Sequence, residues 1–144
     1  MKLFNQDTKV EALKRAPLFE GLSKKELTQL ARVSEDLEVP AGKVLCKEGD
    51  IGHEFFVIID GQVEVTRNGQ PVAMRGSEDF VGEIALLEQT SRTATVTAKT
   101  PLRLFVLTSS SFKTLIDDNP SVERKVLRAL ARRVIELSRD PTLA

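Results

Sequence analysis

Apolar positions change their spacing twice along the chain, and these changes divide it into three stretches. Residues 6–33 have helical periodicity, which is interrupted at Pro17 and resumes after Ser23, where Ser23 and Glu26 have the spacing of a capping box. From residue 35 to residue 108, short apolar runs alternate with turn signals, and the helical spacing returns afterwards. The pattern predicts an N-terminal helical bundle, a β-structure and a second group of helices.

The middle stretch, residues 35–108, has the turn spacing of an antiparallel all-β unit. Apolar runs at residues 55–59 and 102–107 lie between turn signals, and Asn68-Gly69 is a strong signal for a two-residue hairpin. We expect an antiparallel jelly-roll β-barrel here, which makes the fold class α+β, mainly β, in a single domain spanning residues 1–144. The turn signals are Pro40-Ala41-Gly42, Gly49-Asp50, Asp60-Gly61, Asn68-Gly69, Gly76 and Thr100-Pro101.

Two helices are expected in residues 109–139. Ser110 or Ser111 can cap a short first helix, which ends near Asn119-Pro120, and a longer helix follows. Their apolar positions are Phe112, Leu115 and Ile116 in the first helix, and Val122, Val126, Leu127, Leu130, Val134 and Leu137 in the second.

Residues 80–96 carry the candidate chemistry. Period-2 alternation predicts a strand over residues 92–98, with Arg92 on the same face as small apolar residues and the threonines on the other face. An arginine among apolar side chains requires an anion. The free N–H groups at the start of a predicted helical turn, residues 84–87, would donate to the same anion. The sequence therefore predicts an anion site formed by Arg92 and this turn.

This segment resembles the phosphate-binding cassette of the cyclic nucleotide-binding domain family, which includes the regulatory subunits of cyclic-AMP-dependent protein kinase and the bacterial catabolite activator protein. The family pattern is Phe-Gly-Glu-(Leu/Ile)-Ala-Leu, a variable turn, and Pro-Arg-(Ala/Ser/Thr)-Ala-Thr-Val. Val81, inserted after Phe80, and Ser91, in place of the proline, depart from it. The matching residues are Phe80, Gly82, Glu83, Ile84, Ala85, Leu86, Arg92, Thr93, Ala94, Thr95 and Val96.

The resemblance implies a role for each cassette residue. Arg92 would hold the exocyclic oxygens of a cyclic phosphate with its planar guanidinium, and Glu83 would accept the ribose 2′-hydroxyl. Gly82 would permit close approach of the backbone, and the amides of Ile84 and Ala85 would donate. The implied ligand-binding set is Gly82, Glu83, Ile84, Ala85, Arg92, Thr93 and Ala94, with Val63, Val72 and Val81 as further candidates.

The implied ligand is cyclic AMP, with cyclic GMP as the alternative. In the family, a hydroxyl at the position of Thr93 can reach the guanine amino group, although the predicted strand places Thr93 opposite Arg92. Bacterial cyclic-AMP binders also carry serine or threonine there, which favours cyclic AMP. No metal and no other cofactor is expected.

Two other classes of function stay open. A domain of this fold that has lost its ligand would act in protein–protein interaction, but Glu83 and Arg92 argue against this. An enzyme would use Glu83 as general base, yet one histidine, His53, one cysteine, Cys46, and no metal-ligand cluster leave nothing to activate water. We therefore expect a non-enzymatic sensor or regulatory module. Cys46 itself is interpreted as a packed or edge thiol in a strand.

The resemblance also implies that residues 109–139 act as hinge and lid helices. An anion that draws the turn at residues 84–87 inward would change its packing against the first of them, and the long helix would then cover the base. Arg132 or Arg133 could stack on the base, with a solvated side chain as the alternative for each. A homodimer through the long helix is a further expectation.

Composition limits the partners. The chain has 21 basic and 21 acidic residues, so its net charge of zero gives no general attraction to nucleic acid or membranes. No apolar run approaches the ~18 residues of a membrane span, and the first residues become polar too early for a secretory signal. We expect a cytoplasmic location. The sequence ends at Ala144 without a DNA-reading module, so we expect either a stand-alone sensor or a piece of a longer protein. We expect no nucleic-acid partner, and the protein effector is unknown.

Overall fold

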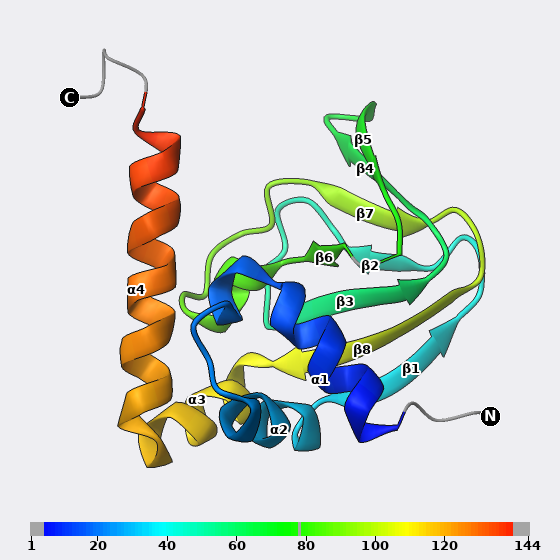
Figure 1. The fold of residues 1–144 in the computed structure, drawn as a ribbon. Coiled ribbons are helices and arrows are strands. Elements are labelled where there is room, and N and C mark those ends of the chain that lie inside the picture. Colours follow the sequence, from blue (N-terminus) through cyan, green and yellow to red (C-terminus); the bar gives the residue numbers. More distant parts are fainter. Residues whose placement is uncertain (1–4, 78, 140–144) are drawn as a thin grey trace.

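The computed structural model describes residues 5–77 and 79–139, except for the side chains of Glu83, Arg133 and Leu137 (Figure 1). The N-terminal helical bundle is confirmed, with a break at Pro17, which opens a short 3₁₀ helix. The capping box is formed as predicted, because the Ser23 hydroxyl accepts from the Glu26 amide and the Glu26 carboxylate accepts from the Ser23 amide. The elements are α1 (Gln6–Arg15), η1 (Pro17–Phe19) and α2 (Lys24–Arg32).

The predicted antiparallel jelly roll is confirmed as two four-stranded sheets, ordered β1-β8-β3-β6 and β2-β7-β4-β5. They are two separate sheets in the described residues and form no continuous closed ring. The strands are β1 (Glu35–Val39), β2 (Val44–Cys46), β3 (Glu54–Asp60), β4 (Val63–Arg67), β5 (Gln70–Arg75), β6 (Phe80–Val81), β7 (Thr95–Ala98) and β8 (Leu102–Thr108), and the short 3₁₀ helix η2 (Glu83–Leu86) follows β6.

The sheet containing β3 and β8 is buried on both faces. Phe55 and Phe105 point toward the helices, where they pack with Phe19 and Phe112. The side chains that alternate with them along the two strands point into the space between the sheets; they are Phe56, Ile58, Leu104 and Val106. Two-sided burial explains why these strands are continuous apolar runs instead of alternating ones.

The Asn68-Gly69 hairpin is also confirmed. Both residues have positive φ, 52° and 77°, and the flanking Arg67 and Gln70 are paired. Two successive positive φ angles fit the type I′ turn that matches the twist of a two-stranded ribbon. This turn places the β4–β5 hairpin at one end of the second sheet.

The C-terminal helices are α3 (Ser109–Asp118) and α4 (Pro120–Leu137), but the predicted cap of α3 was wrong. The cap is Thr108, whose hydroxyl accepts from the Ser111 amide at 3.2 Å. The chain passes from β8 directly into the helix, so the last strand residue takes the capping position.

Helix α4 is held against the N-terminal helices by residues between Ser121 and Arg132. It buries Val122, Val126 and Ala129 and packs on η1 and α3. The buried carboxylate of Glu26 accepts from Lys125 at 2.6 Å and from the Ser121 hydroxyl at 2.8 Å, and on the surface Arg132 donates to Glu20 at 3.0 Å. None of the described helices is both long and apolar enough to span a bilayer.

Candidate functional site

The predicted helical turn is present one residue earlier than expected, as η2. It begins after Gly82, which has a φ of 84°, a conformation that an L side chain rarely adopts. The buried Ala85 and Leu86 fix η2 against β3 and α3. The Ala85 amide already donates to the Gly82 carbonyl at 3.1 Å. A bound anion would therefore have to share or replace this bond.

The predicted strand over residues 92–98 was wrong in its first half, because β7 begins only at Thr95. The Arg92 amide donates to the Asp50 carbonyl at 2.7 Å, and the Arg92 carbonyl accepts from Gly49 at 2.9 Å. These bonds to a loop replace regular sheet pairing, so strict alternation does not apply. As a result Arg92, Thr93 and Ala94 all line the same cavity.

The guanidinium of Arg92 lies in a slot between two glycines. A Cβ atom at Gly52 would be 2.6 Å from Arg92 Cζ, and a Cβ at Gly82 would overlap Arg92 Nη1. The Nη2 atom donates to the Glu54 carbonyl at 2.7 Å. The slot and this bond fix the orientation of the guanidinium before any ligand arrives, which lowers the entropic cost of binding.

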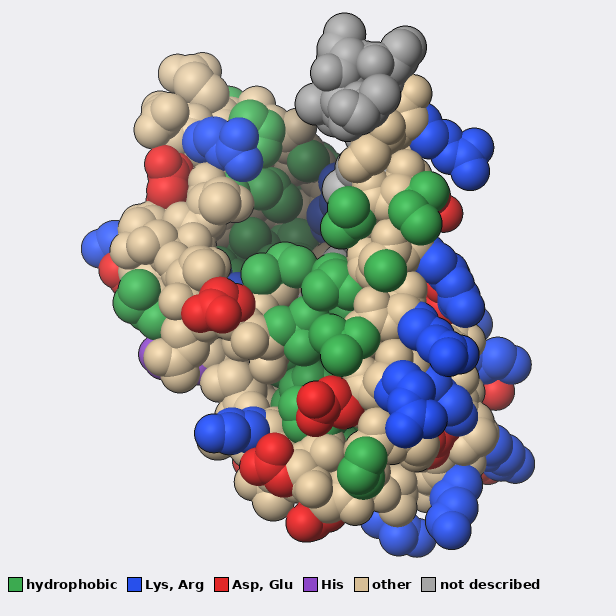
Figure 2. Space-filling model, turned by 90° about the vertical axis from the view of Figure 1, so that its left-hand side faces the viewer, with side chains coloured by type: hydrophobic (Ala, Val, Ile, Leu, Met, Phe, Trp, Pro, Cys, Tyr) green, Lys and Arg blue, Asp and Glu red, His purple; other side chains and the backbone are tan. Residues whose placement is uncertain are grey.

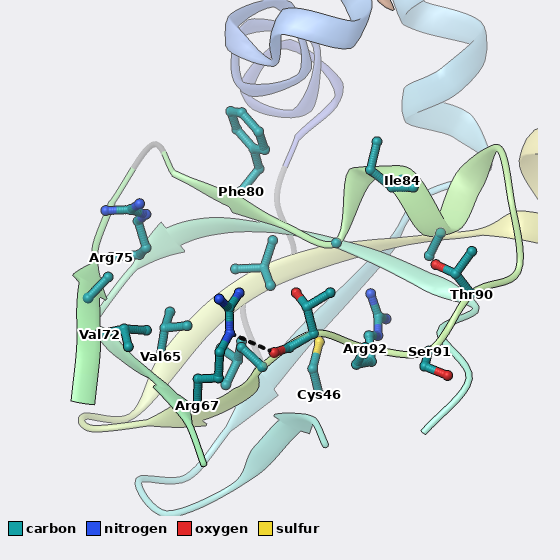
Figure 3. Close-up of a pocket in the computed structure, with 17 residues that line it drawn as sticks. Cys46, Val65, Arg67, Val72, Arg75, Phe80, Ile84, Thr90, Ser91 and Arg92 are labelled. Carbon is teal, nitrogen blue, oxygen red and sulfur yellow. Dashed lines mark hydrogen bonds between the residues drawn. The ribbon is translucent and has the colours of Figure 1, made fainter. Parts of the chain in front are cut away.

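The slot opens into a cavity of about 740 Å³, within the usual range for small-molecule sites (Figure 3). Figure 2 shows it as a hollow beside α4, with hydrophobic side chains on the surface between them. The lining residues are Cys46, Val65, Arg67, Val72, Ala73, Arg75, Phe80, Val81, Gly82, Ile84, Ala85, Thr90, Ser91, Arg92, Thr93, Ala94 and Val96.

Eight of the ten candidate residues from the sequence thus line one cavity, and two need separate comment. Val63 is fully buried between the sheets; it shares a face of β4 with Val65 and Arg67 but lies deeper. The side chain of Glu83 lies outside the described residues. The long-helix candidates Arg132 and Arg133 are not in the lining: Arg132 pairs with Glu20, and the Arg133 side chain is not described.

Several lining residues were not predicted. Val65, Arg67 and Arg75 line the cavity from the β4–β5 hairpin, outside the cassette. Gly52, which is not in the lining, forms one side of the slot around Arg92. Cys46, predicted to be a packed or edge thiol, is buried in β2 and forms part of the cavity wall. Burial raises the pKa of its thiol, an effect that the nearby Arg92 charge opposes.

The charged side chains that line the cavity in the described part of the chain are all cationic. Three guanidinium groups line it, and no described carboxylate does; nor does any described ion pair include one of the three arginines. Within the described part of the chain there is also no group of histidine, cysteine and carboxylate side chains that could hold a metal ion. The arrangement fits a small ligand with at least one anionic group.

Curated relatives share this part of the chain. A cyclic nucleotide-gated potassium channel of Rhizobium etli is 36% identical over 118 residues, covering 81% of this chain and 33% of the channel. The cAMP-dependent protein kinase regulatory subunit of Schizosaccharomyces pombe is 34% identical, covering 81% of this chain and 29% of that protein. The chain therefore spans about a third of the length of these relatives.

Solved structures agree on the fold. The N-terminal domain of a transcriptional regulator from Streptomyces coelicolor superposes with a TM-score of 0.83 at 29% identity, covering 90% of this chain and 96% of that one. The regulatory domain of Toxoplasma gondii PKA, crystallised with cAMP, has a TM-score of 0.71 at 26% identity, covering 78% of this chain and 45% of that one. A family model for the cyclic nucleotide-binding domain matches residues 36–119. The chain belongs to the cyclic nucleotide-binding domain family.

Proposed function

We propose that the cavity binds cyclic AMP, with its phosphate on Arg92 and at the start of η2. The observation that carries this proposal is the position of the Arg92 guanidinium, which is held between Gly52 and Gly82 beside a helical N-terminus. A planar fork suits two phosphate oxygens, and the unpaired amides of the first turn add donors. Relatives named for cAMP, and a neighbour crystallised with it, support this choice of ligand.

The other cassette residues take the roles implied by the family. Glu83 accepts the ribose 2′-hydroxyl, Gly82 lets the sugar approach the backbone, and the Ile84 amide donates to the phosphate. Cyclic GMP is the second candidate, and one observation favours it: Thr93 lines the cavity beside Arg92, contrary to the strand prediction.

Substitution of Arg92 tests the proposal directly. Arg92→Ala removes a charge-assisted hydrogen bond, which contributes ~1.5–3 kcal/mol, so cyclic AMP should bind on the order of tenfold to more than a hundredfold more weakly by calorimetric titration. Arg92→Lys keeps the charge without the fork. Arg124→Ala, an exposed position on α4, is the matched control. Unchanged affinity in Arg92→Ala would refute the assigned role.

A second experiment identifies the ligand. The chain has seven phenylalanines and no tryptophan or tyrosine, so its own near-ultraviolet absorbance is very weak. A purine that copurifies should dominate the spectrum, and mass spectrometry would identify it. Cyclic GMP in place of cyclic AMP would select the second candidate.

We infer that the module signals through α3 and α4. Leu86 of η2 is in the same apolar cluster as Phe112 of α3 and Val122 of α4, so a shift of η2 reaches both helices. Leu127, Val134 and Ile135 of α4 are about half exposed, and they can cover the base or meet a second copy of the chain. Hydrogen exchange over residues 110–139 should change with cyclic AMP; identical protection would leave a binder without a switch.

The proposal also covers the domain organisation, the absence of enzymatic activity, the location and the partner of the protein. The module is a single cyclic nucleotide-binding domain without enzymatic activity, in the cytoplasm, and it acts on a protein effector. If incubation with cyclic AMP yields the ring-opened monophosphate, the protein is instead an enzyme, with Glu83 as its candidate base.

A further inference from the structure

Residues 92–94 line the cavity but lie outside the ladders of the sheet that follows them. Strands β4 and β7 pair as far as Thr66 and Thr95, where this ladder ends. On the other side, β2 pairs with β7 only as far as Cys46 and Val96. The segment that carries Arg92 is therefore not held by ladder bonds to β4 or β2, and its conformation depends on other contacts.

A side chain of β4 supplies one of these contacts. Arg67 follows the last paired residue of β4, and its Nε donates to the Thr93 carbonyl at 3.1 Å, the bond drawn as a dashed line in Figure 3. The amide and carbonyl of Arg92 bond to the loop at residues 49–50. The backbone is thus held at Arg92 from the loop and at the next carbonyl from Arg67.

Glu48 holds the turn beside Arg67. Its carboxylate accepts from the Asn68 amide at 3.0 Å, and its own amide donates to the Thr95 hydroxyl at 3.0 Å. One residue therefore connects the tip of the β4–β5 hairpin to the start of β7. Because Asn68 directly follows Arg67, this connection keeps the Arg67 side chain within reach of Thr93.

These contacts act on the end of the cavity where Arg92 lies. A segment without ladder bonds that also loses a side-chain contact samples more conformations, and its apparent affinity falls with the fraction of molecules in the binding conformation. Resting on the proposed function, we infer that Arg67 is a positioning residue: its Nε–H fixes Thr93, and through it Arg92, while Glu48 fixes Arg67. Every cyclic nucleotide has the phosphate, so this role does not depend on the base.

Glutamine and lysine separate the donor of Arg67 from its charge. The amide nitrogen of glutamine occupies the same place along the side chain as Nε of arginine, so Arg67→Gln keeps the N–H donor and loses the charge. Arg67→Lys keeps the charge but has a methylene there. By calorimetric titration, Arg67→Ala and Arg67→Lys should bind cyclic AMP and cyclic GMP about threefold to tenfold more weakly, and Arg67→Gln within about twofold of wild type.

A double variant tests whether Glu48 acts through Arg67. Glu48→Ala should weaken both nucleotides by less than Arg67→Ala does, and Glu48→Ala/Arg67→Ala should bind as weakly as Arg67→Ala alone, because the two changes break one chain of contacts. Additive losses would overturn the role of Glu48. Gln70→Ala, at an exposed position of the same hairpin, is the control and should bind as wild type does.

The Arg67 side chain is exposed, so thermal unfolding of its variants should match that of wild type. Rescue by lysine but not by glutamine would show that the charge of Arg67 acts on the ligand, and would overturn the positioning role. Unchanged affinity in Arg67→Ala, equal losses in all three Arg67 variants, or a loss for one nucleotide alone would overturn it as well. Wild-type protein that binds neither nucleotide would overturn the proposed function, and the positioning role with it.

Discussion

The slot around Arg92 makes two glycines sensitive to any side chain, for different reasons. Gly82 has a positive φ, so a substitution there strains the backbone as well as the slot. Gly52 has no such constraint, and the three atoms nearest to an added Cβ all belong to the Arg92 side chain. Gly52 is therefore the position at which the slot can be disturbed with little effect on the fold.

We predict that Gly52→Ala displaces the guanidinium and weakens cyclic AMP binding on the order of tenfold, since it disturbs one charge-assisted contact. Thermal unfolding should change little. Gly21→Ala is the matched control, because the added Cβ would lie 3.9 Å from Lys125 Cβ, an ordinary contact. Equal binding by both variants would show that the slot does not position Arg92.

At the scale of single residues, the sequence predicts those site residues that lie close together in the chain. Arg92 and Gly82 belong to one motif, so their type and spacing identify the site. Gly52 contacts Arg92 from a loop, and Arg67 lines the cavity from a strand elsewhere in the chain, and nothing in their own neighbourhood marks them. The alternation argument failed at residues 92–94 because backbone bonds to Asp50 and Gly49 replace sheet pairing there.

Among the elements, α2 and α4 are joined by one buried carboxylate, in addition to the apolar packing of α4. Burial alone would raise the pKa of Glu26, but hydrogen bonds from Lys125, Ser23 and Ser121 outweigh it and lower the pKa to about 2. The capping box of α2 was predictable from four consecutive residues. The bonds to α4 were not, because Lys125 and Ser121 are distant in the chain.

A lowered pKa means that the folded state favours the carboxylate. The stability from Glu26 is therefore fully present above its ordinary pKa of 4.5 and is lost as pH falls toward 2. We predict that Glu26→Gln costs about 2–3 kcal/mol at neutral pH in urea unfolding, and that the difference from wild type shrinks below pH 4.5.

Glu20→Gln is the control, since it also removes a carboxylate that faces a basic residue of α4. The Glu20–Arg132 pair is exposed, so its loss should cost less than about 1 kcal/mol. If the two variants cost the same, or if the Glu26→Gln difference does not depend on pH, the burial and the bonds of Glu26 do not govern the stability of this contact.

For the whole molecule, one sheet joins two apolar clusters. Strands β3 and β8 send alternate side chains to the helices and to the interior of the sandwich. The division into helices, strands and helices was predictable from periodicity alone. The sequence does not predict which of the two sheets packs against the helices. A continuous apolar run indicates burial on both faces of a strand but not which element covers each face.

We predict that the helices and the sandwich unfold in one transition. Phe105→Leu leaves a small void at a fully buried position and should lower the free energy of unfolding by about 1–2 kcal/mol. Helix and strand signals in circular dichroism should shift together. Val72→Ala, at a position 56% exposed, should change stability by less than about 0.5 kcal/mol. Separate transitions would show that the two clusters fold independently.

Contacts between Ser121 and Arg132 hold α4 in place, whereas Val134 and Ile135 near its end are exposed, so the proposed switch would act on the last turns of the helix. With 18 residues, the helix is about 27 Å long, so a tilt of about 10° about its first residue would move its far end by about 5 Å and would also displace Arg132 from Glu20. A sub-ångström change in packing beneath Val122 and Val126 would therefore become a displacement as wide as a side chain at Val134 and Ile135. In the proposed switch, the length of the helix would determine how far its end moves. The bonds of Glu26 to Ser121 and Lys125 would determine how large a packing change is needed to tilt it.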